Sequence, residues 1–211
     1  MQQENSDHPA RLSVDYPGRE LNRSTTFFRL FAAIPILFVL ASVGGWTWPA
    51  TYENGKEAAA AAGGVLFFGP LLMILFRQKY PRWWFDFNLQ LTRFSTRVIA
   101  YLALMSDRYP STDEEQSVHL ELKYPDVKQD LNRWLPLVKW LLAVPHYIAL
   151  LFLGIAAVFA VVIAWFAILF TGRYPRGIFN FVEGVMRWGL RVEAYSMLLV
   201  TDRYPPFRLA A

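Results

Sequence analysis

The sequence predicts a predominantly helical membrane protein with minor β structure, built as two tandem repeats. Each repeat is expected to hold a short strand, a transmembrane helical hairpin and an amphipathic interfacial helix. Charged residues make up only 18% of the chain, against about 25% in a typical soluble domain. Long apolar runs and motifs that recur in the same order in both halves complete the prediction. The expected boundaries are a polar tail (1–10), repeat 1 (11–110), an acidic linker (111–117) and repeat 2 (118–207).

The recurring motifs define the two repeats. Leu21-Asn22-Arg23 returns as Leu131-Asn132-Arg133, and Ala33-Ile34-Pro35 returns as Ala143-Val144-Pro145. Lys79-Tyr80-Pro81-Arg82 corresponds to Arg173-Tyr174-Pro175-Arg176, and Asp107-Arg108-Tyr109-Pro110 corresponds to Asp202-Arg203-Tyr204-Pro205. Proline removes a backbone donor and restricts the residue before it, and tyrosine is common at membrane interfaces. We therefore interpret these motifs as structural, with each Tyr-Pro ending an element at the headgroup level.

Each repeat opens with an alternating stretch, residues 12–16 and 118–124, which is typical of a half-buried strand. A single strand is not stable alone. We expect the two strands to pair either with each other or with chain near the Tyr-Pro turns.

The apolar spans follow the strands. Residues 30–48 and 58–76 each have a length close to the roughly 20 residues that cross a bilayer, and residues 49–57 form a polar turn between them. In the second repeat, residues 140–170 carry no charge, and one helix of that length would exceed a 30 Å hydrocarbon core. The repeat favours a short hairpin that turns near Gly154. Whether this segment crosses once, crosses twice or re-enters stays open.

An amphipathic helix is predicted after each hairpin. Apolar residues recur in steps of three and four between Trp84 and Met105 and again between Ile178 and Leu199. The polar faces hold two arginine pairs, for which we hypothesise contacts with lipid phosphates: Arg93, Arg97, Arg187 and Arg191. For Arg187 the structural alternative is an ion pair with Glu183, one turn earlier.

The basic residues indicate the topology. Of 21 Lys and Arg residues, Lys56 alone lies in a connection on the far side of the predicted membrane. The positive-inside rule then places both termini in the cytoplasm, with four crossings. A single crossing in the second repeat would put six arginines outside, and crossing by the amphipathic helices would bury arginines at high cost. Because topology accounts for the basic charge, no nucleic-acid partner is expected.

Four segments of the second half resemble a known family. The residues that show the resemblance are Phe166 to Gly177, Arg187-Trp188, Arg191 to Tyr195 and Thr201 to Phe207. The similarity in the first half is weaker. The family consists of bacterial membrane proteins described only as a domain of unknown function. The resemblance implies a bacterial inner (plasma) membrane protein and brings no catalytic residues.

The residues form no recognisable catalytic or cofactor-binding constellation. There is no cysteine, the three histidines lack metal-site spacing, and Asp107 and Asp202 fit turn chemistry better than acid–base catalysis. His146, inside an apolar run, is interpreted as an interface or packing residue with a functional alternative. We expect a non-enzymatic scaffold or accessory subunit that binds membrane lipids, a membrane-protein partner or a second copy. The alternatives are a transporter or channel subunit and, third, a lipid-modifying enzyme.

Overall fold

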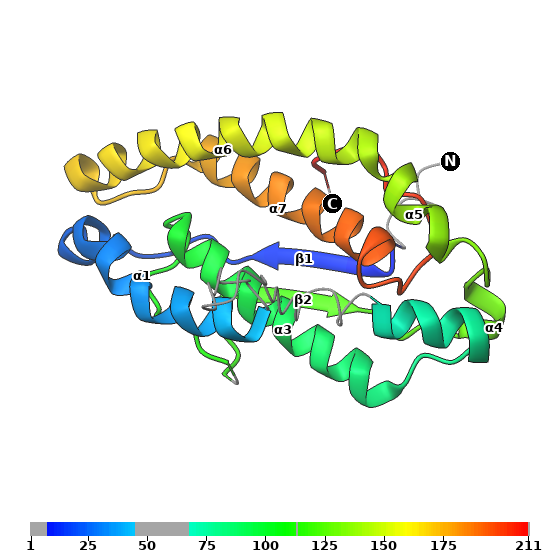
Figure 1. Ribbon diagram of the computed structural model, residues 1–211. Coiled ribbons are helices and arrows are strands. Elements are labelled where there is room, and N and C mark those ends of the chain that lie inside the picture. Colours follow the sequence, from blue (N-terminus) through cyan, green and yellow to red (C-terminus); the bar gives the residue numbers. More distant parts are fainter. Residues whose placement is uncertain (1–7, 45–67, 113, 211) are drawn as a thin grey trace, which may run out of the picture.

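The computed structural model describes residues 8–44, 68–112 and 114–210, which are predominantly helical. The elements in chain order are β1 (Ala10–Val14), α1 (Arg23–Gly44), η1 (Met73–Arg77), α3 (Arg82–Leu102), β2 (Val118–Leu122), α4 (Val127–Asp130), α5 (Pro136–Leu142), α6 (Val144–Thr171) and α7 (Arg176–Ser196). In the view of Figure 1 the strands cross the centre of the picture, with α6 and α7 drawn above them and α1 and α3 below.

The two strands form an antiparallel sheet in which Leu12 lies opposite Leu120. Strand pairing is thus one of the two arrangements that the sequence predicted. Ala10, Leu12 and Val14 are buried while Arg11 and Ser13 are exposed, so one face of β1 packs inward and the other stays polar. β1 begins two residues before the predicted stretch and ends at Val14, just ahead of Pro17, which cannot donate to a ladder.

The predicted amphipathic helices are α3 and α7, and both lie against the sheet. α7 contacts β1 on one side and α6 on the other, and α3 contacts β2 and α1. In Figure 1, α6, α7 and β1 run roughly side by side. The fold is therefore layered, with a sheet, then α3 and α7, then α1 and α6. The main hydrophobic core lies where these layers meet.

α6 is one continuous helix of 28 residues that passes through Gly154 without a turn. The predicted hairpin at Gly154 is therefore wrong, and with it the count of four crossings. Residues 144–171 are apolar along their whole length and contain no internal turn residues apart from this one glycine, so the helix continues. α6 ends at Gly172, whose φ of 73° is left-handed and suits a helix C-terminus.

The first predicted hairpin is described only in part. α1 starts seven residues before the predicted span and continues through Pro35 to Gly44. Residues 45–48, the polar turn at 49–57 and the first ten residues of the second span lie outside the described residues. The remainder of that span is helical at 68–72 and continues as the π-helix η1 to Arg77.

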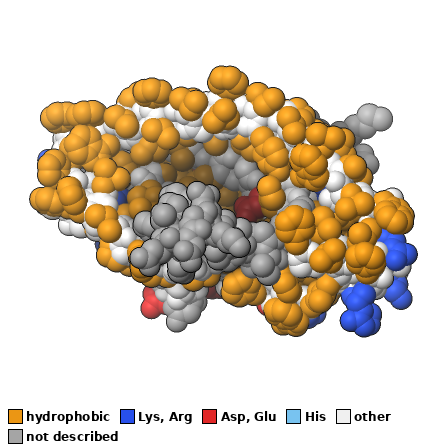
Figure 2. Space-filling view, in the orientation of Figure 1, with side chains coloured by type: hydrophobic (Ala, Val, Ile, Leu, Met, Phe, Trp, Pro, Cys, Tyr) orange, Lys and Arg blue, Asp and Glu red, His pale blue; other side chains and the backbone are white. Residues whose placement is uncertain are grey.

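α1 and α6 are each long and apolar enough to cross a membrane. Their outward sides are apolar, and together with α5 they contribute much of the apolar surface seen in Figure 2. On α6 the exposed large apolar residues form one stripe along the helix, with steps of one, three or four: Val144, Ile148, Leu151, Phe152, Ile155, Val158, Phe159, Val162, Ile163, Phe166 and Phe170. We call the surface formed by the outward sides of α1, α5 and α6 the apolar face.

Candidate functional site

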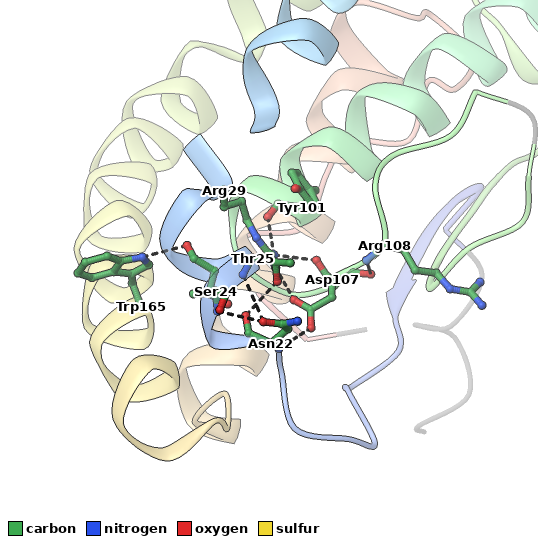
Figure 3. Close-up of polar contacts among 10 residues, drawn as sticks. Asn22, Ser24, Thr25, Arg29, Tyr101, Asp107, Arg108 and Trp165 are labelled. Atoms are coloured by element: carbon green, nitrogen blue, oxygen red, sulfur yellow. Dashed lines mark hydrogen bonds and ion pairs between the residues drawn. The ribbon is translucent and has the colours of Figure 1, made fainter. Parts of the chain in front are cut away.

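Arg29, near the start of α1, is buried and pairs with Asp107 of the first Asp-Arg-Tyr-Pro motif. The same guanidinium donates to the carbonyl oxygens of Tyr101 at 3.0 Å and Ser106 at 2.7 Å, and it lies 4.6 Å from the centre of the Tyr101 ring. The second oxygen of Asp107 accepts from the backbone N–H of Asn22 at 2.9 Å. Figure 3 shows how these contacts join the beginning of α1 to the loop after α3.

Lys139, in α5, has a closely similar environment. Its ammonium group lies 2.6 Å from Asp202 and donates to the carbonyl of Thr201 at 2.7 Å. The ammonium also lies 5.1 Å from the centre of the Tyr195 ring. The second Asp202 oxygen accepts from the N–H of Asn132. The aspartate of each motif thus holds the helix entrance of the same half of the chain.

These contacts define the chemistry that the two aspartates can perform. Asp107 and Asp202 each have both carboxylate oxygens in use, one on a buried cation and one on a backbone N–H. Burial lowers the pKa of Lys139 below its ordinary value, and the bond to Asp202 offsets part of that effect. A half-buried carboxylate that is paired in this way positions chain segments, because each oxygen already holds a cation or a backbone N–H.

The rest of each Asp-Arg-Tyr-Pro motif completes the turn. Tyr109 and Tyr204 are each 47% exposed and stack edge-on against Tyr101 and Tyr195, at 5.8 Å and 5.7 Å between ring centres. The backbone N–H of Arg108 and that of Arg203 are held by a hydroxyl two residues earlier, on Ser106 and Thr201. Pro110 is buried at the end of the first motif, and Pro205 at the end of the second.

The two Tyr-Pro-Arg motifs lie in the protein core and begin helices. Pro81 and Pro175 are the N-cap residues of α3 and α7, which suits a residue with a fixed φ. Tyr80 donates to the carbonyl of Leu198 at 2.9 Å, and Tyr174 donates to that of Ala103 at 3.1 Å. Burial raises the pKa of Tyr80 to about 12. Both tyrosines are buried rather than placed at an outer surface.

The first arginine of each predicted pair contacts the sheet. Arg93 donates from Nε to the carbonyl of Leu120 at 3.1 Å, and Arg187 donates from Nε to that of Leu12 at 3.0 Å. Arg187 also contacts Glu183 at 2.7 Å, so the intrahelical ion pair considered from the sequence is present. These guanidinium groups join each amphipathic helix to the strand of the other half of the chain.

The second arginine of each pair is buried and contacts a loop. Arg97 donates to the carbonyl of Ser111 at 2.9 Å, and Arg191 donates to that of Ala210 at 2.8 Å. Like Arg93 and Arg187, they donate to backbone carbonyl oxygens outside their own helices. The structure gives their N–H groups backbone partners in positions where the sequence led us to expect lipid phosphates.

His146 is packed among aromatic rings at the start of α6. Its ring stacks on Phe207 at 3.9 Å, and its Nδ1 accepts from the indole N–H of Trp188 at 3.2 Å. This is the packing role that we favoured from the sequence. His119 pairs with Asp15 on the open face of the sheet at 3.0 Å. Within the described ranges, no group of three His, Cys, Asp or Glu side chains could hold a metal ion.

A groove of about 660 Å³ lies between α1 and α6, and no pattern in the sequence indicates it. Residues of α3 and α7 form its floor, and Figure 2 shows the apolar face hollowed between these helices. Most lining side chains are aliphatic: those of α6 include Ala157, Val158, Val161 and Val162. The polar residues in the wall are Thr26 and Arg29. No periodicity in one helix could have revealed a groove, because four separate elements form it.

Comparison with known proteins identifies one domain. A domain of unknown function, DUF4389, is found at residues 134–208, the part of the chain that contains α5, α6, α7 and the second Asp-Arg-Tyr-Pro motif. Comparisons with curated proteins and with solved structures yield no match.

Proposed function

We propose that this protein is a non-catalytic membrane module that inserts its apolar face into lipid and acts as a scaffold or accessory subunit. The apolar face carries the proposal. Its exposed residues on α1 include Phe27, Phe31, Ile34 and Phe38, which are 54–71% exposed. Soluble monomers rarely expose an apolar surface that extends over several helices. The use of Asp107 and Asp202 in ion pairs supports a structural role for the recurring motifs.

We also propose that the chain arose by tandem duplication. Contacts that occur twice support it: the Arg29–Asp107 and Lys139–Asp202 pairs, and the Arg93 and Arg187 bonds to the strands. In addition, Tyr16 donates to the carbonyl of Tyr174, and Tyr124 donates to that of Tyr80. Each half supplies the tyrosine that holds the turn of the other, so the two halves are expected to fold only together.

The apolar helices are proposed to lie in the plane of the membrane, within one leaflet, instead of crossing it. α7 lies alongside α6, and β1 lies alongside α7. If α6 stood along the bilayer normal, the sheet would lie at the depth of the hydrocarbon core. Its His119–Asp15 pair, whose side chains are 52% and 65% exposed, would then face lipid at high cost. An in-plane helix leaves the open face of the sheet in water.

The in-plane orientation also agrees with the positions of the basic residues at the two ends of α6. A single crossing by α6 would separate Lys139 from Arg173 and Arg176 by a bilayer, against the positive-inside rule. With α6 in plane, the basic residues at both of its ends stay on one side. We propose that this side is the cytoplasm, that both termini lie there, and that the membrane is the bacterial inner membrane.

Depth measurements test the orientation. Because the chain contains no cysteine, single variants Ile148→Cys, Ile155→Cys, Val162→Cys and Phe170→Cys can each carry one spin label in lipid nanodiscs. An in-plane helix places the four labels at similar depths. A crossing helix separates the first and last by about 33 Å along its axis, at 1.5 Å per residue. A steady change in depth from Ile148 to Phe170 would overturn the in-plane arrangement.

A pull-down in mild detergent tests the scaffold role. Under the proposal, the protein retains a stable membrane-protein partner or a second copy of itself. A matched purification of a variant with Phe31→Ser and Phe38→Ser on the outward side of α1 separates contacts made through the apolar face from those made elsewhere. Isolation as a lone chain from native membranes would contradict the scaffold role and leave the membrane orientation unaffected.

A further inference from the structure

We infer that the groove between α1 and α6 binds one acyl chain of a membrane phospholipid, with the ester carbonyl held at Thr26 and Arg29. This inference rests on the proposed insertion of the apolar face into lipid. It adds a defined site and a ligand class to that face.

The groove has the dimensions and lining of a lipid-chain site. Its volume of about 660 Å³ lies within the range of roughly 300–1,000 Å³ typical of small-molecule sites. Leu30, Val158 and Val162 contribute aliphatic walls, and Val185 and Met186 contribute the floor. Gly154 also lines the groove, and a Cβ added there would meet nothing within 4 Å. The groove is therefore open next to Gly154.

One part of the groove wall carries polar atoms with unmet hydrogen-bonding capacity. Thr26 is 1% exposed, and its hydroxyl has no hydrogen-bond partner among the described residues. The Nε–H of Arg29, also in the wall, likewise has no partner within that part of the chain. A buried polar group without a partner costs about 1–3 kcal/mol. The Arg29 Nε–H can only donate and the Thr26 hydroxyl can donate as well as accept, so one acceptor oxygen can satisfy both groups.

The position of the groove indicates which ligand with an acceptor oxygen can reach it. The groove lies between α1 and α6, the two long helices of the apolar face. A water-soluble ligand would have to pass through the lipid against that face. A phospholipid is already there, and its ester joins an apolar chain to a carbonyl acceptor without a charge of its own. The combination of aliphatic walls and two donors matches that arrangement.

Native mass spectrometry of the full chain tests the site, with dioleoyl phosphatidylglycerol as the probe and free oleate in a parallel arm. Gly154→Leu places a side chain in the groove, and Gly177→Leu is the matched control, because Gly177 is open but lies on the exposed first turn of α7. Thr26→Val removes the hydroxyl and keeps the shape of the side chain. We expect phospholipid retention to fall about 5-fold or more in Thr26→Val, which loses a hydrogen bond, and in Gly154→Leu, whose side chain fills the site. Retention should stay unchanged in Gly177→Leu.

Stability measurements separate the alternatives. Under the inference, added phospholipid raises the unfolding temperature of the wild type more than that of Thr26→Val. Equal stabilisation of both would overturn the assignment, and so would retention of oleate in preference to the phospholipid. Failure of the groove variants to change lipid retention, with label depths still equal along α6, would refute the site while leaving the in-plane insertion intact.

Discussion

The ammonium group of Lys139 lies 2.6 Å from a carboxylate oxygen of Asp202, and the lysine side chain is completely buried. Removing the carboxylate would leave an uncompensated cation inside the protein. We expect Asp202→Asn to lower the free energy of unfolding by about 3–5 kcal/mol, measured by thermal or denaturant unfolding in a mild detergent. Asp107→Asn, opposite the buried Arg29, is expected to have a similar effect.

The control for this prediction is an exposed ion pair. Arg173 and Glu20 lie 3.8 Å apart with side chains 77% and 62% exposed, so Glu20→Gln should change stability by about 1 kcal/mol or less. The double variant Lys139→Met with Asp202→Leu should recover much of the loss, because no charge stays buried. If Asp202→Asn were no more disruptive than Glu20→Gln, the buried pair would not hold α5 to the loop after α7.

The buried side chain of Tyr80 should make the protein less stable at alkaline pH. Its pKa is about 12 in the folded protein, against 10.0 for an unperturbed tyrosine. Between these two values the unfolded chain loses the proton while the folded chain keeps it. The contribution of Tyr80 to stability therefore falls by about 3 kcal/mol as pH rises from 10 to 12. Denaturant unfolding at several pH values measures this slope.

The variant Tyr80→Phe should remove the share of that pH dependence that Tyr80 contributes, while Tyr174, whose pKa burial also raises, keeps its own share. At neutral pH it should cost about 1 kcal/mol, because the carbonyl of Leu198 loses its donor. Tyr109→Phe is the matched control, since that side chain is 47% exposed and should leave the alkaline slope as it is. An identical slope in Tyr80→Phe and the wild type would show that another group causes the alkaline loss.

Local patterns in the sequence were sufficient for several elements. The steps of three and four that predicted α3 and α7 depend only on one helix face, and alternation predicted both strands. The partners of Arg93 and Arg187 could not be predicted in this way. Both donate to strand carbonyls that are distant in the chain, and a basic helix face looks the same in sequence whether it meets phosphates or a sheet edge.

The error at Gly154 has a different physical origin. The hairpin was predicted because the first half appeared to contain one and because a helix of that length exceeds the bilayer thickness. Length is a constraint only for a helix that crosses the membrane. A helix supported along one side by α7 has no such limit, and the inward residues Leu150, Leu153 and Ala157 pack along that side. Sequence alone could not show that α7 lies beneath α6.

Arg187 and Arg93 should act as links between the helices and the strands. We expect Arg187→Gln to destabilise the protein by about 2–4 kcal/mol, because it removes a charge-assisted bond to the carbonyl of Leu12, a bond to that of Leu209 and the ion pair with Glu183. Arg93→Gln, with one such bond resolved to Leu120, should cost less. Unfolding experiments measure the stability, and native mass spectrometry measures retained anionic lipid.

The two measurements separate a structural role from lipid binding. Loss of stability with unchanged lipid retention supports the strand-linking role of these arginines. The opposite result, unchanged stability with lost anionic lipid, would instead favour the phosphate contacts expected from the sequence. The substitution Arg187→Lys provides the control for charge, since lysine keeps the charge but cannot bridge Leu12 and Leu209 with a rigid fork.

Gly184 should tolerate no side chain, because the C-terminal segment lies directly on α7 there. A Cβ at this position would be 2.8 Å from the Cβ of Leu209 and 3.1 Å from its carbonyl oxygen. Gly184→Ala would push the segment away and weaken the bonds from Arg187 to Leu209 and from Arg191 to Ala210. We expect the free energy of unfolding to fall by about 1–3 kcal/mol, a loss typical of overpacking.

In Gly177→Ala, where a Cβ meets nothing within 4 Å, the same change should instead stabilise α7 by up to about 1 kcal/mol. Hydrogen exchange of residues 208–210 locates the effect: faster exchange in Gly184→Ala alone is the expected result, whereas equal stability and exchange in the two variants would mean that the segment is not held against α7.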